Sequence, residues 1–247
     1  MSGRNTLYLL HCGVLIEPNG NGGTNPIQVP CYLIVAASGK RYLVDTGNPA
    51  ALIGADDCQP WYPAKCEITQ ADDPIARLAA LGIAPGDIDA IIATHFDFDH
   101  AGRYDAFGPL GTDVWVQRAH IGAALSDRAR YDAHLWNVPG LRWRQVHGDH
   151  EIEPGLTLLR TDGHAVGHQS IVVETEEGPV ILAADAIDSA RMAETRQFPN
   201  YYDAEATNCS IDRLLELSRE QDAPIIFGHD YEQWSTLPHS PEPYSRS

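Results

Sequence analysis

Apolar and polar positions in the first third of the chain alternate as they do in β-strands. The stretches LYLLHCGVLI and PIQVPCYLIVA precede a turn at residues 38–40 and the segment RYLVDTG. Apolar runs that flank a short polar connection are typical of hairpins, so this part predicts an antiparallel meander. Residues 48–73 then mix proline, glycine and charge with Trp61 and Tyr62. This composition predicts an irregular segment that covers a site or an interface.

The rest of the chain predicts helices between short apolar strands. PIARLAALGI has apolar residues at helical spacing, with Pro74 in its first turn and Gly82 at its end, and a second helix is expected from His120 to about Arg130. Other expected elements are a strand at IDAIIAT, strands at 114–117, 143–146 and 157–161, a hairpin of SIVVET with VILAADAI, a helix at CSIDRLLELSRE and a strand at PIIFGHD. The repeated order predicts two similar halves packed sheet to sheet, with helices outside. The tail from Pro238 is expected to fray.

Length and charge limit the possible functions. The chain has 247 residues, 43% of them hydrophobic, which predicts one domain over residues 1–247. A formal net charge of -17 argues against nucleic acid and anionic membranes, which are bound mainly through lysine and arginine. No signal-peptide core occurs near the N-terminus, and no stretch approaches the roughly 18–20 apolar residues of a membrane span. We therefore expect a soluble, cytoplasmic protein.

The cysteines argue against a disulfide framework. Their number is odd, they are scattered, and no C-x-x-C pair occurs, so a thiolate zinc site is not expected either. We expect reduced thiols that mostly fill the core at Cys12, Cys31, Cys58, Cys66 and Cys209.

The stretch THFDFDHAG, residues 94–102, carries the first candidate chemistry. It places His95, Asp97, Asp99 and His100 directly after the IDAIIAT strand. A polar turn is the plain alternative, but neither a helix face nor a strand face needs this pattern for packing. Loops that follow strands in layered α/β proteins commonly carry functional groups, so the stretch predicts a metal-binding loop.

Potential ligands follow several other apolar strands. They are Asp45 in VDTG, His164 and His168 in DGHAVGHQS, Asp185 and Asp188 in AADAID, and His229 and Asp230 in FGHD. Histidines such as His164 and His229 are ordinarily core or loop residues when they stand alone. Several strand ends together can gather imidazoles and carboxylates around two divalent ions about 3.5–4 Å apart.

On these motifs the chain resembles the metallo-β-lactamase superfamily and, within it, the N-acyl homoserine lactonases. The motifs that carry the resemblance are, in order, CYLIVAASGKRYLVDTG, the H-x-D-x-D-H loop, VQRAHIGAAL, PGLTLLRTDGHAVGHQS, ILAADA and IIFGHDYEQ. The resemblance implies an α+β fold, a four-layer αβ/βα sandwich around a dinuclear metal site. It also implies hydrolysis of a lactone ring, with N-acyl homoserine lactone as the substrate.

The resemblance also implies roles for individual residues. Carried over by position, the first metal would be held by His95, Asp97 and His164, the second by Asp99, His100 and His229, and Asp185 would bridge them. Asp99 would pass a proton to the leaving oxygen as general acid and base. Asp45 and His168 would orient ligands through hydrogen bonds, although Asp45 could equally cap a turn and His168 could itself be a metal ligand.

The chain departs from the family pattern at two positions. The lactonases usually carry a histidine where this chain has Asp97, and a carboxylate there favours iron or manganese relative to zinc. The expected cofactors are two divalent metal ions, zinc foremost, with iron or manganese as alternatives. The second position lies three residues beyond the bridging aspartate. The lactonases share a tyrosine there, whereas this chain has Asp188. An ionised carboxylate cannot donate a hydrogen bond, so Asp188 is a candidate catalytic group for a changed binding mode.

Other functions stay open at this point. One is hydrolysis of another cyclic ester or amide, and a different class is a diiron redox protein, suggested by Asp97. A redox protein of that kind normally needs an electron-donor module, for which the 18 residues after His229 are too few. The expected partner is a small lactone or other cyclic substrate, and a homodimer is a further possibility.

Overall fold

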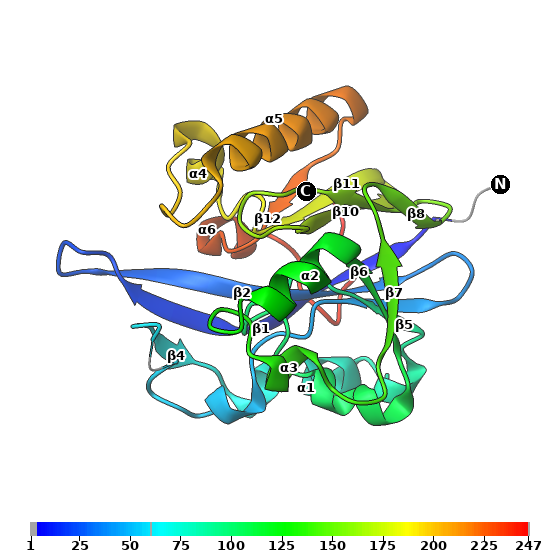
Figure 1. Ribbon diagram of the computed structural model, residues 1–247. Helices are drawn as coiled ribbons and strands as arrows, with labels where there is room; N and C mark the ends of the chain where they lie inside the picture. Colours follow the sequence, from blue (N-terminus) through cyan, green and yellow to red (C-terminus); the bar gives the residue numbers. More distant parts are fainter. Residues whose placement is uncertain (1–3, 60, 247) are drawn as a thin grey trace.

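Two β-sheets pack face to face, and helices cover the outer face of each, so the layers run helix, sheet, sheet, helix (Figure 1). This computed structural model describes residues 4–59 and 61–246. The predicted α+β sandwich is confirmed. Among the described residues, no helix combines the length and the apolar composition that a membrane crossing requires.

The first sheet contains the predicted meander. Its seven strands have the order β4-β1-β2-β3-β5-β6-β7. Their bounds are β1 (Thr6–Pro18), β2 (Thr24–Val35), β3 (Arg41–Val44), β4 (Lys65–Glu67), β5 (Ala90–Ile92), β6 (Asp113–Gln117) and β7 (Arg142–Val146). β1, β2 and β3 pair antiparallel, whereas β3, β5, β6 and β7 are parallel. β4 was not predicted because it is short and lies within the irregular segment 48–73, where it pairs with β1.

The second sheet contains the predicted hairpin. Its five strands have the order β12-β11-β10-β9-β8. Their bounds are β8 (His150–Glu153), β9 (Leu156–Arg160), β10 (Gln169–Thr175), β11 (Gly178–Ala184) and β12 (Ile225–Phe227). β10 and β11 pair antiparallel from Ile171 opposite Leu182 to Thr175 opposite Gly178. β8 escaped prediction because HEIE contains a single apolar residue.

The helices differ from prediction mainly at their ends. The α-helices are α1 (Pro74–Ala80), α2 (Arg118–Ser126), α3 (Ala133–Trp136), α4 (Ala190–Thr195), α5 (Ala204–Gln221) and α6 (Tyr231–Trp234). Single 3-10 turns lie at Ala50–Leu52, Gln70–Asp72, Pro85–Asp87, Tyr104–Ala106 and Gly108–Leu110. α5 begins before the predicted Cys209, because the side chain of Asp203 accepts from Ala206 N at its N-terminus. α2 does not reach Arg130, because the Asp127 carboxylate accepts Arg130 N at 3.1 Å and turns the chain.

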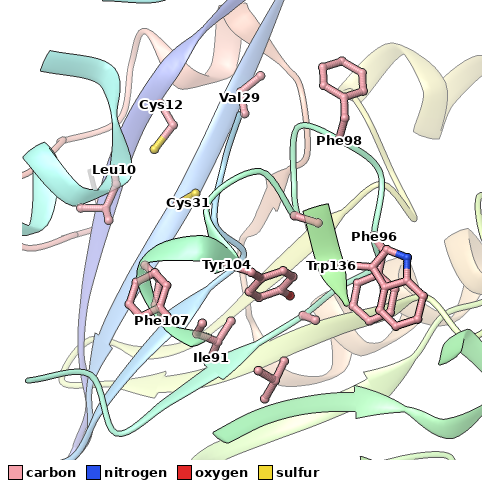
Figure 2. Close-up of a cluster of buried hydrophobic side chains, with 14 of the residues drawn as sticks. Leu10, Cys12, Val29, Cys31, Ile91, Phe96, Phe98, Tyr104, Phe107 and Trp136 are labelled. Atoms are coloured by element: carbon pink, nitrogen blue, oxygen red, sulfur yellow. The ribbon is translucent and has the colours of Figure 1, made fainter. Parts of the chain in front are cut away.

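The apolar residues of the loop after β5 anchor it to the core. Phe96 is 1% exposed and stacks on Trp136 with ring centroids 4.8 Å apart, as Figure 2 shows. The same cluster contains Cys12 of β1 and Cys31 of β2. Phe96 therefore fixes the loop from below, while its polar neighbours face the other way. All five cysteines have free thiols, as predicted, and Cys12, Cys31 and Cys58 are buried.

The C-terminal tail is not frayed. Ser240 N donates to Leu9 O at 2.9 Å, and Tyr244 N donates to Leu7 O at 2.7 Å. Tyr244 also packs against the apolar cluster between the sheets. The prediction from Pro238 onward was wrong because β1 offers carbonyl groups along this edge, and the tail satisfies them.

Asp72 anchors the irregular segment 48–73 to the body of the protein. Its Oδ2 accepts from Thr69 N at 2.8 Å and from Thr69 Oγ1 at 2.7 Å, and its Oδ1 accepts from Arg77 Nη2 at 2.6 Å. Burial acts to raise the pKa of Asp72, but these hydrogen bonds and nearby His11 outweigh it, so the pKa lies below its usual value.

We expect Asp72→Asn to lower the free energy of unfolding by about 1–2 kcal/mol at neutral pH, since a charge-assisted network is lost. A carboxyl group whose folded pKa is depressed stabilises the fold above its unfolded pKa of about 3.9. That contribution disappears as the pH falls through the folded pKa. Urea denaturation across this range should therefore show the two proteins converging at acid pH. A difference in unfolding free energy between the two proteins that stays constant across pH would contradict the ionic role. The control is Asp105→Asn, the same substitution at an exposed side chain.

Candidate metal centre

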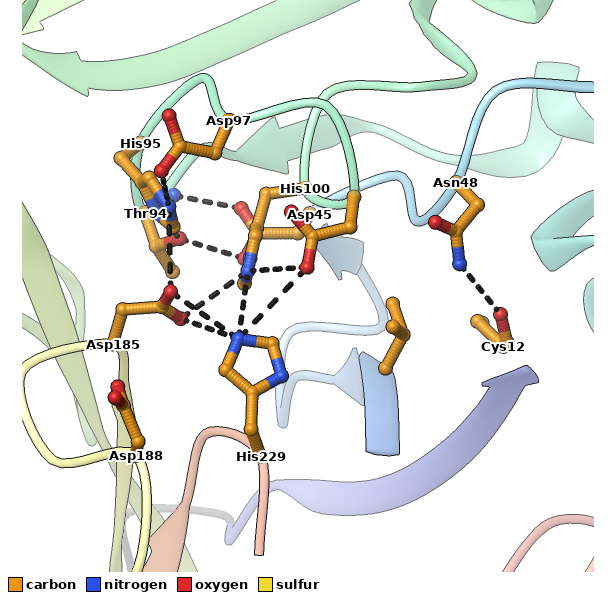
Figure 3. Close-up of polar contacts among 12 residues, drawn as sticks. Cys12, Asp45, Asn48, Thr94, His95, Asp97, His100, Asp185, Asp188 and His229 are labelled. Atoms are coloured by element: carbon orange, nitrogen blue, oxygen red, sulfur yellow. Dashed lines mark hydrogen bonds and ion pairs between the residues drawn. The ribbon is translucent and has the colours of Figure 1, made fainter. Parts of the chain in front are cut away.

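Four strand ends converge at one edge of the sandwich. The loop after β5 brings His95, His164 follows β9, Asp185 follows β11, and His229 follows β12. Figure 3 shows His95, His100, Asp185 and His229 directed toward one another from these separate segments. The structure therefore brings together side chains that are far apart in the sequence.

The first group of donors is His95, Asp97 and His164. His164 Nε2 lies 3.1 Å from His95 Nε2 and 2.9 Å from Asp97 Oδ2. His95 Nε2 lies 3.4 Å from Asp97 Oδ2. These are the three residues that the resemblance assigns to the first metal.

The second group of donors is Asp99, His100 and His229. His100 Nε2 lies 3.4 Å from His229 Nε2 and 3.7 Å from Asp99 Oδ2. His229 Nε2 lies 3.9 Å from Asp99 Oδ2. They correspond to the set that the resemblance assigns to the second metal.

Asp185 lies between the two groups and contacts both, and its Oδ2 is also 3.2 Å from His229 Nε2. Its Oδ2 is 3.6 Å from His95 Nε2 and 3.4 Å from His164 Nε2. Its Oδ1 is 3.2 Å from both His100 Nε2 and His229 Nε2. This is the geometry of a carboxylate that can bridge two cations.

The donors fit a pair of divalent cations. A tetrahedral ion about 2.0–2.2 Å from each donor places the donors roughly 3.3–3.6 Å apart, and most of the spacings above are close to this range. Asp185 Oδ1 is buried, and the two imidazole nitrogens 3.2 Å from it form no hydrogen bond of suitable geometry, so a cation shared with them would satisfy it. Imidazole and carboxylate donors suit zinc, iron and manganese.

Outer partners orient three of the imidazoles. His95 Nδ1 lies 2.9 Å from Thr94 Oγ1, and His100 Nδ1 lies 2.9 Å from Asp45 Oδ2. His229 Nδ1 lies 2.7 Å from Gln28 O. Each contact directs Nε2 toward the centre.

Asp45 and His168 occupy supporting positions. Asp45 is 2% exposed and accepts from Thr94 N at 2.8 Å as well as contacting His100. His168 is fully buried, with Nδ1 2.9 Å from Thr161 Oγ1 and Nε2 accepting from Asp185 N at 3.2 Å. Burial lowers the pKa of His168 to about 3, so it acts as a neutral acceptor that fixes the bridging residue.

A glycine allows the loop to pack closely beside His100. Gly102 N donates to Gly47 O at 2.8 Å, and Thr46 N donates to His100 O at 2.7 Å. A Cβ atom at position 102 would lie 2.2 Å from the backbone carbon of Asn48. Only glycine fits there, and this close contact fixes the backbone that carries His100.

The carboxylates make the second group strongly negative. Burial acts to lower the pKa of His229, but Asp185 and Asp99 outweigh it and raise the pKa to about 10. His100 behaves in the same way, and its pKa lies well above the usual value. A position that attracts protons this strongly also attracts divalent cations, and the two compete.

Five of the seven donors line a large pocket, namely Asp97, Asp99, His164, Asp185 and His229. Its volume is about 1200 Å³, and Trp61, Tyr62, Phe98 and Tyr201 contribute to its wall. Trp61 is 60% exposed and meets Phe98 edge to face at 5.7 Å. The segment 48–73 therefore covers a site, which was one of the two predicted outcomes, and its aromatic residues offer an apolar surface to a ligand.

Asp188 also lines this pocket but belongs to neither group of donors. Figure 3 shows it beside Asp185. Tyr202 donates its hydroxyl to Asp188 Oδ2 at 3.1 Å. Burial and the neighbouring Asp185 raise the pKa of Asp188 to about 6. The side chain can thus carry a proton near neutral pH.

Two residues of the site were missed at the level of sequence. Tyr202 lies 4.7 Å from the His164 ring, centroid to centroid, and Arg130 binds Asp97 through two hydrogen bonds. Tyr202 carried no signal beyond the pair of tyrosines in NYYDAE, and Arg130 was assigned to a helix.

A family model described as the metallo-beta-lactamase superfamily matches residues 24–229. An N-acyl homoserine lactonase of Bacillus thuringiensis is 35% identical over 239 residues, which cover 92% of this chain and 94% of the relative. The N-acyl homoserine lactonase AttM of Rhizobium radiobacter is 28% identical over 263 residues, covering 97% of this chain and 98% of the relative.

Solved structures agree with these relatives. The AiiA protein of B. thuringiensis, in a structure with N-decanoyl-L-homoserine bound at the active site, superposes with a TM-score of 0.88 at 32% identity. The match covers 98% of this chain and 100% of the AiiA chain. An N-acyl homoserine lactone hydrolase with its product N-hexanoyl-L-homoserine at the catalytic metal centre gives the same TM-score, identity and coverage.

Proposed function

The chain belongs to the metallo-β-lactamase superfamily, and from this premise we propose that it opens the ring of N-acyl homoserine lactones as a quorum-quenching hydrolase. One observation carries the proposal: two groups of metal donors share Asp185 at the floor of a pocket of about 1200 Å³. The enzyme is a metal-dependent hydrolase with a dinuclear site.

The reaction adds water to the lactone carbonyl carbon and breaks the bond to the ring oxygen. When bound, two divalent cations would lower the pKa of a water molecule and polarise the carbonyl oxygen. The products are a carboxylate and an alcohol, with one proton released at neutral pH. One cation would be held by His95, Asp97 and His164. The other would be held by Asp99, His100 and His229, and Asp185 would bind both.

Asp99 is proposed to transfer the proton. Its side chain is 11% exposed, and it lines the pocket in which the lactone is proposed to bind. Burial raises the pKa of Asp99 despite nearby His100 and His229, which favours a proton-carrying carboxyl group. A carboxyl group at this position can deliver a proton to the ring oxygen as it leaves.

Asp188 is proposed to contact the substrate within the pocket, beside the metal donors. Its hydrogen bond from Tyr202 orients the carboxyl group, both residues line the pocket, and the Tyr202 ring lies 4.7 Å from that of His164, centroid to centroid. A protonated Asp188, or the Tyr202 hydroxyl, can donate to the substrate amide or carbonyl.

Zinc is the proposed metal, with iron or manganese as alternatives because Asp97 supplies a hard oxygen donor. Elemental analysis of protein purified without added metal would identify the ion.

Activity is tested by following acid release from N-hexanoyl and N-decanoyl homoserine lactone with metal-loaded protein. We expect hydrolysis that disappears after exhaustive chelation and returns when the removed ion is restored, because the donors alone cannot polarise the carbonyl group. A panel of γ-lactones without the acyl amide, cyclic amides and open-chain esters defines how far the pocket selects the ring. Activity that is indifferent to chelation, or no turnover of any of these substrates, would reject the proposal.

A cytoplasmic location and a homodimer are also proposed. Free cysteines suit a reducing compartment, and exposed Trp61 offers an apolar contact for a second subunit. Cell fractionation and light scattering after size-exclusion chromatography test these two points.

A further inference from the structure

Arg130 contacts the first group of donors directly. Its Nε donates to Asp97 Oδ1 at 2.8 Å, and its Nη2 donates to Asp97 Oδ2 at 2.7 Å. Its Nη1 donates to His164 O at 2.9 Å. This forked arrangement is specific to arginine and holds both oxygens of the carboxylate.

The same guanidinium reaches a nitrogen that faces the first metal position. Nη2 lies 2.8 Å from His164 Nε2. A guanidinium only donates, so the imidazole nitrogen accepts. That nitrogen has a single lone pair, which can accept from Arg130 or coordinate a cation but cannot do both.

Arg130 is held firmly in this position. Its side chain is 23% exposed, and its guanidinium carbon lies 5.1 Å from the Tyr131 ring centre and 5.5 Å from that of Tyr201. Among the described residues, Asp97 is the only carboxylate that forms an ion pair with it. The guanidinium is therefore held between Asp97 and His164.

The charges around the two positions are unequal as a result. At the first position the charge of Asp97 is cancelled by Arg130, and only the shared Asp185 remains. At the second position no arginine or lysine of the described residues pairs with Asp99, and Asp45 lies behind His100 with Oδ2 2.9 Å from its Nδ1. A divalent cation is thus attracted less strongly to the first position.

We propose that Arg130 is an affinity-setting cation at the first metal position, which makes that position fill after the second and exchange its ion more readily. This inference rests on the dinuclear site of the proposed function. It assigns to Arg130 an effect on metal binding that is separate from any contact with the substrate.

The test compares two substitutions at Arg130. Glutamine keeps an N–H donor for Asp97 but removes the charge, whereas lysine keeps the charge but loses the fork. Metal-free protein is titrated with Zn²⁺ against a chromophoric chelator and with Co²⁺, whose visible absorption reports coordination. We expect Arg130→Gln to tighten the weaker of two binding steps at least about tenfold, since one unit of repulsion disappears. Arg130→Lys should leave that step weak.

A second variant pair keeps the test decisive if Arg130→Gln folds poorly. Asp97→Asn leaves the guanidinium unpaired beside the metal position, so the weaker step should be lost. Adding Arg130→Gln to Asp97→Asn restores the summed charge of the unsubstituted pair, so the weaker step should return.

The possible outcomes separate this inference from the proposed function. Two equal binding steps in the unsubstituted protein, equal effects of glutamine and lysine, or a double variant whose weaker step stays lost would overturn the role of Arg130 and leave the hydrolase intact. A protein that binds no divalent cation would overturn both.

Discussion

Asp99→Asn is expected to reduce kcat for N-acyl homoserine lactones by about 10²–10⁴-fold while both metal ions are retained, because general acid–base catalysis typically contributes this much. The amide keeps an oxygen that can coordinate a cation but has no proton to give to the leaving oxygen. Steady-state kinetics with metal content measured on the same samples would show the two effects separately.

A thiolactone makes the test of Asp99 specific. A thiol has a pKa of about 8.5, so its thiolate leaves without the protonation that an alkoxide needs. The variant should therefore lose much less activity on an N-acyl homocysteine thiolactone than on the oxygen lactone. Equal losses on both substrates would point to damaged metal binding or positioning instead. Asp105→Asn, the same change at an exposed side chain nearby, should affect neither substrate.

The sequence was informative wherever a donor follows an apolar strand. IDAIIAT ends in the loop of His95, and PIIFGHD ends in His229, so strand prediction and candidate ligands support each other. The structure places all seven predicted donors around one centre, with Asp185 in the middle. Strand ends of a layered fold meet at one edge, which is why separate motifs could be combined without knowing any distance.

Features that depend on long-range partners could not be predicted in this way. Arg130 is one of 17 basic residues, and nothing near it in the chain marks it as the partner of Asp97 across 33 positions. The tail beyond Pro238 has a composition typical of loops, yet it adds to the edge of β1. Both depend on a surface that exists only after the sheets have formed.

Asp185→Asn is expected to weaken both metal-binding steps and to abolish activity at stoichiometric metal. The carboxylate contacts both groups of donors with its two oxygens, and an amide offers one oxygen without charge. Loss of a residue that only orients a ligand costs about 10–100-fold in metal affinity, so a residue that touches both positions should cost more than that at each. The metal titration described for Arg130 measures both steps, and excess metal should restore only part of the activity.

Asp188→Asn is the matched control, because it is the same substitution three residues away on the same loop, at a side chain that belongs to neither group of donors. It should leave both binding steps unchanged and alter kcat/KM alone, since Asp188 is proposed to face the substrate. If Asp185→Asn kept two tight binding steps, the bridging role would be wrong. The two cations would then bind independently, and the orphaned Oδ1 of Asp185 would need another explanation. If instead Asp188→Asn also lost metal, the boundary between the metal donors and the substrate pocket would have to move to include it.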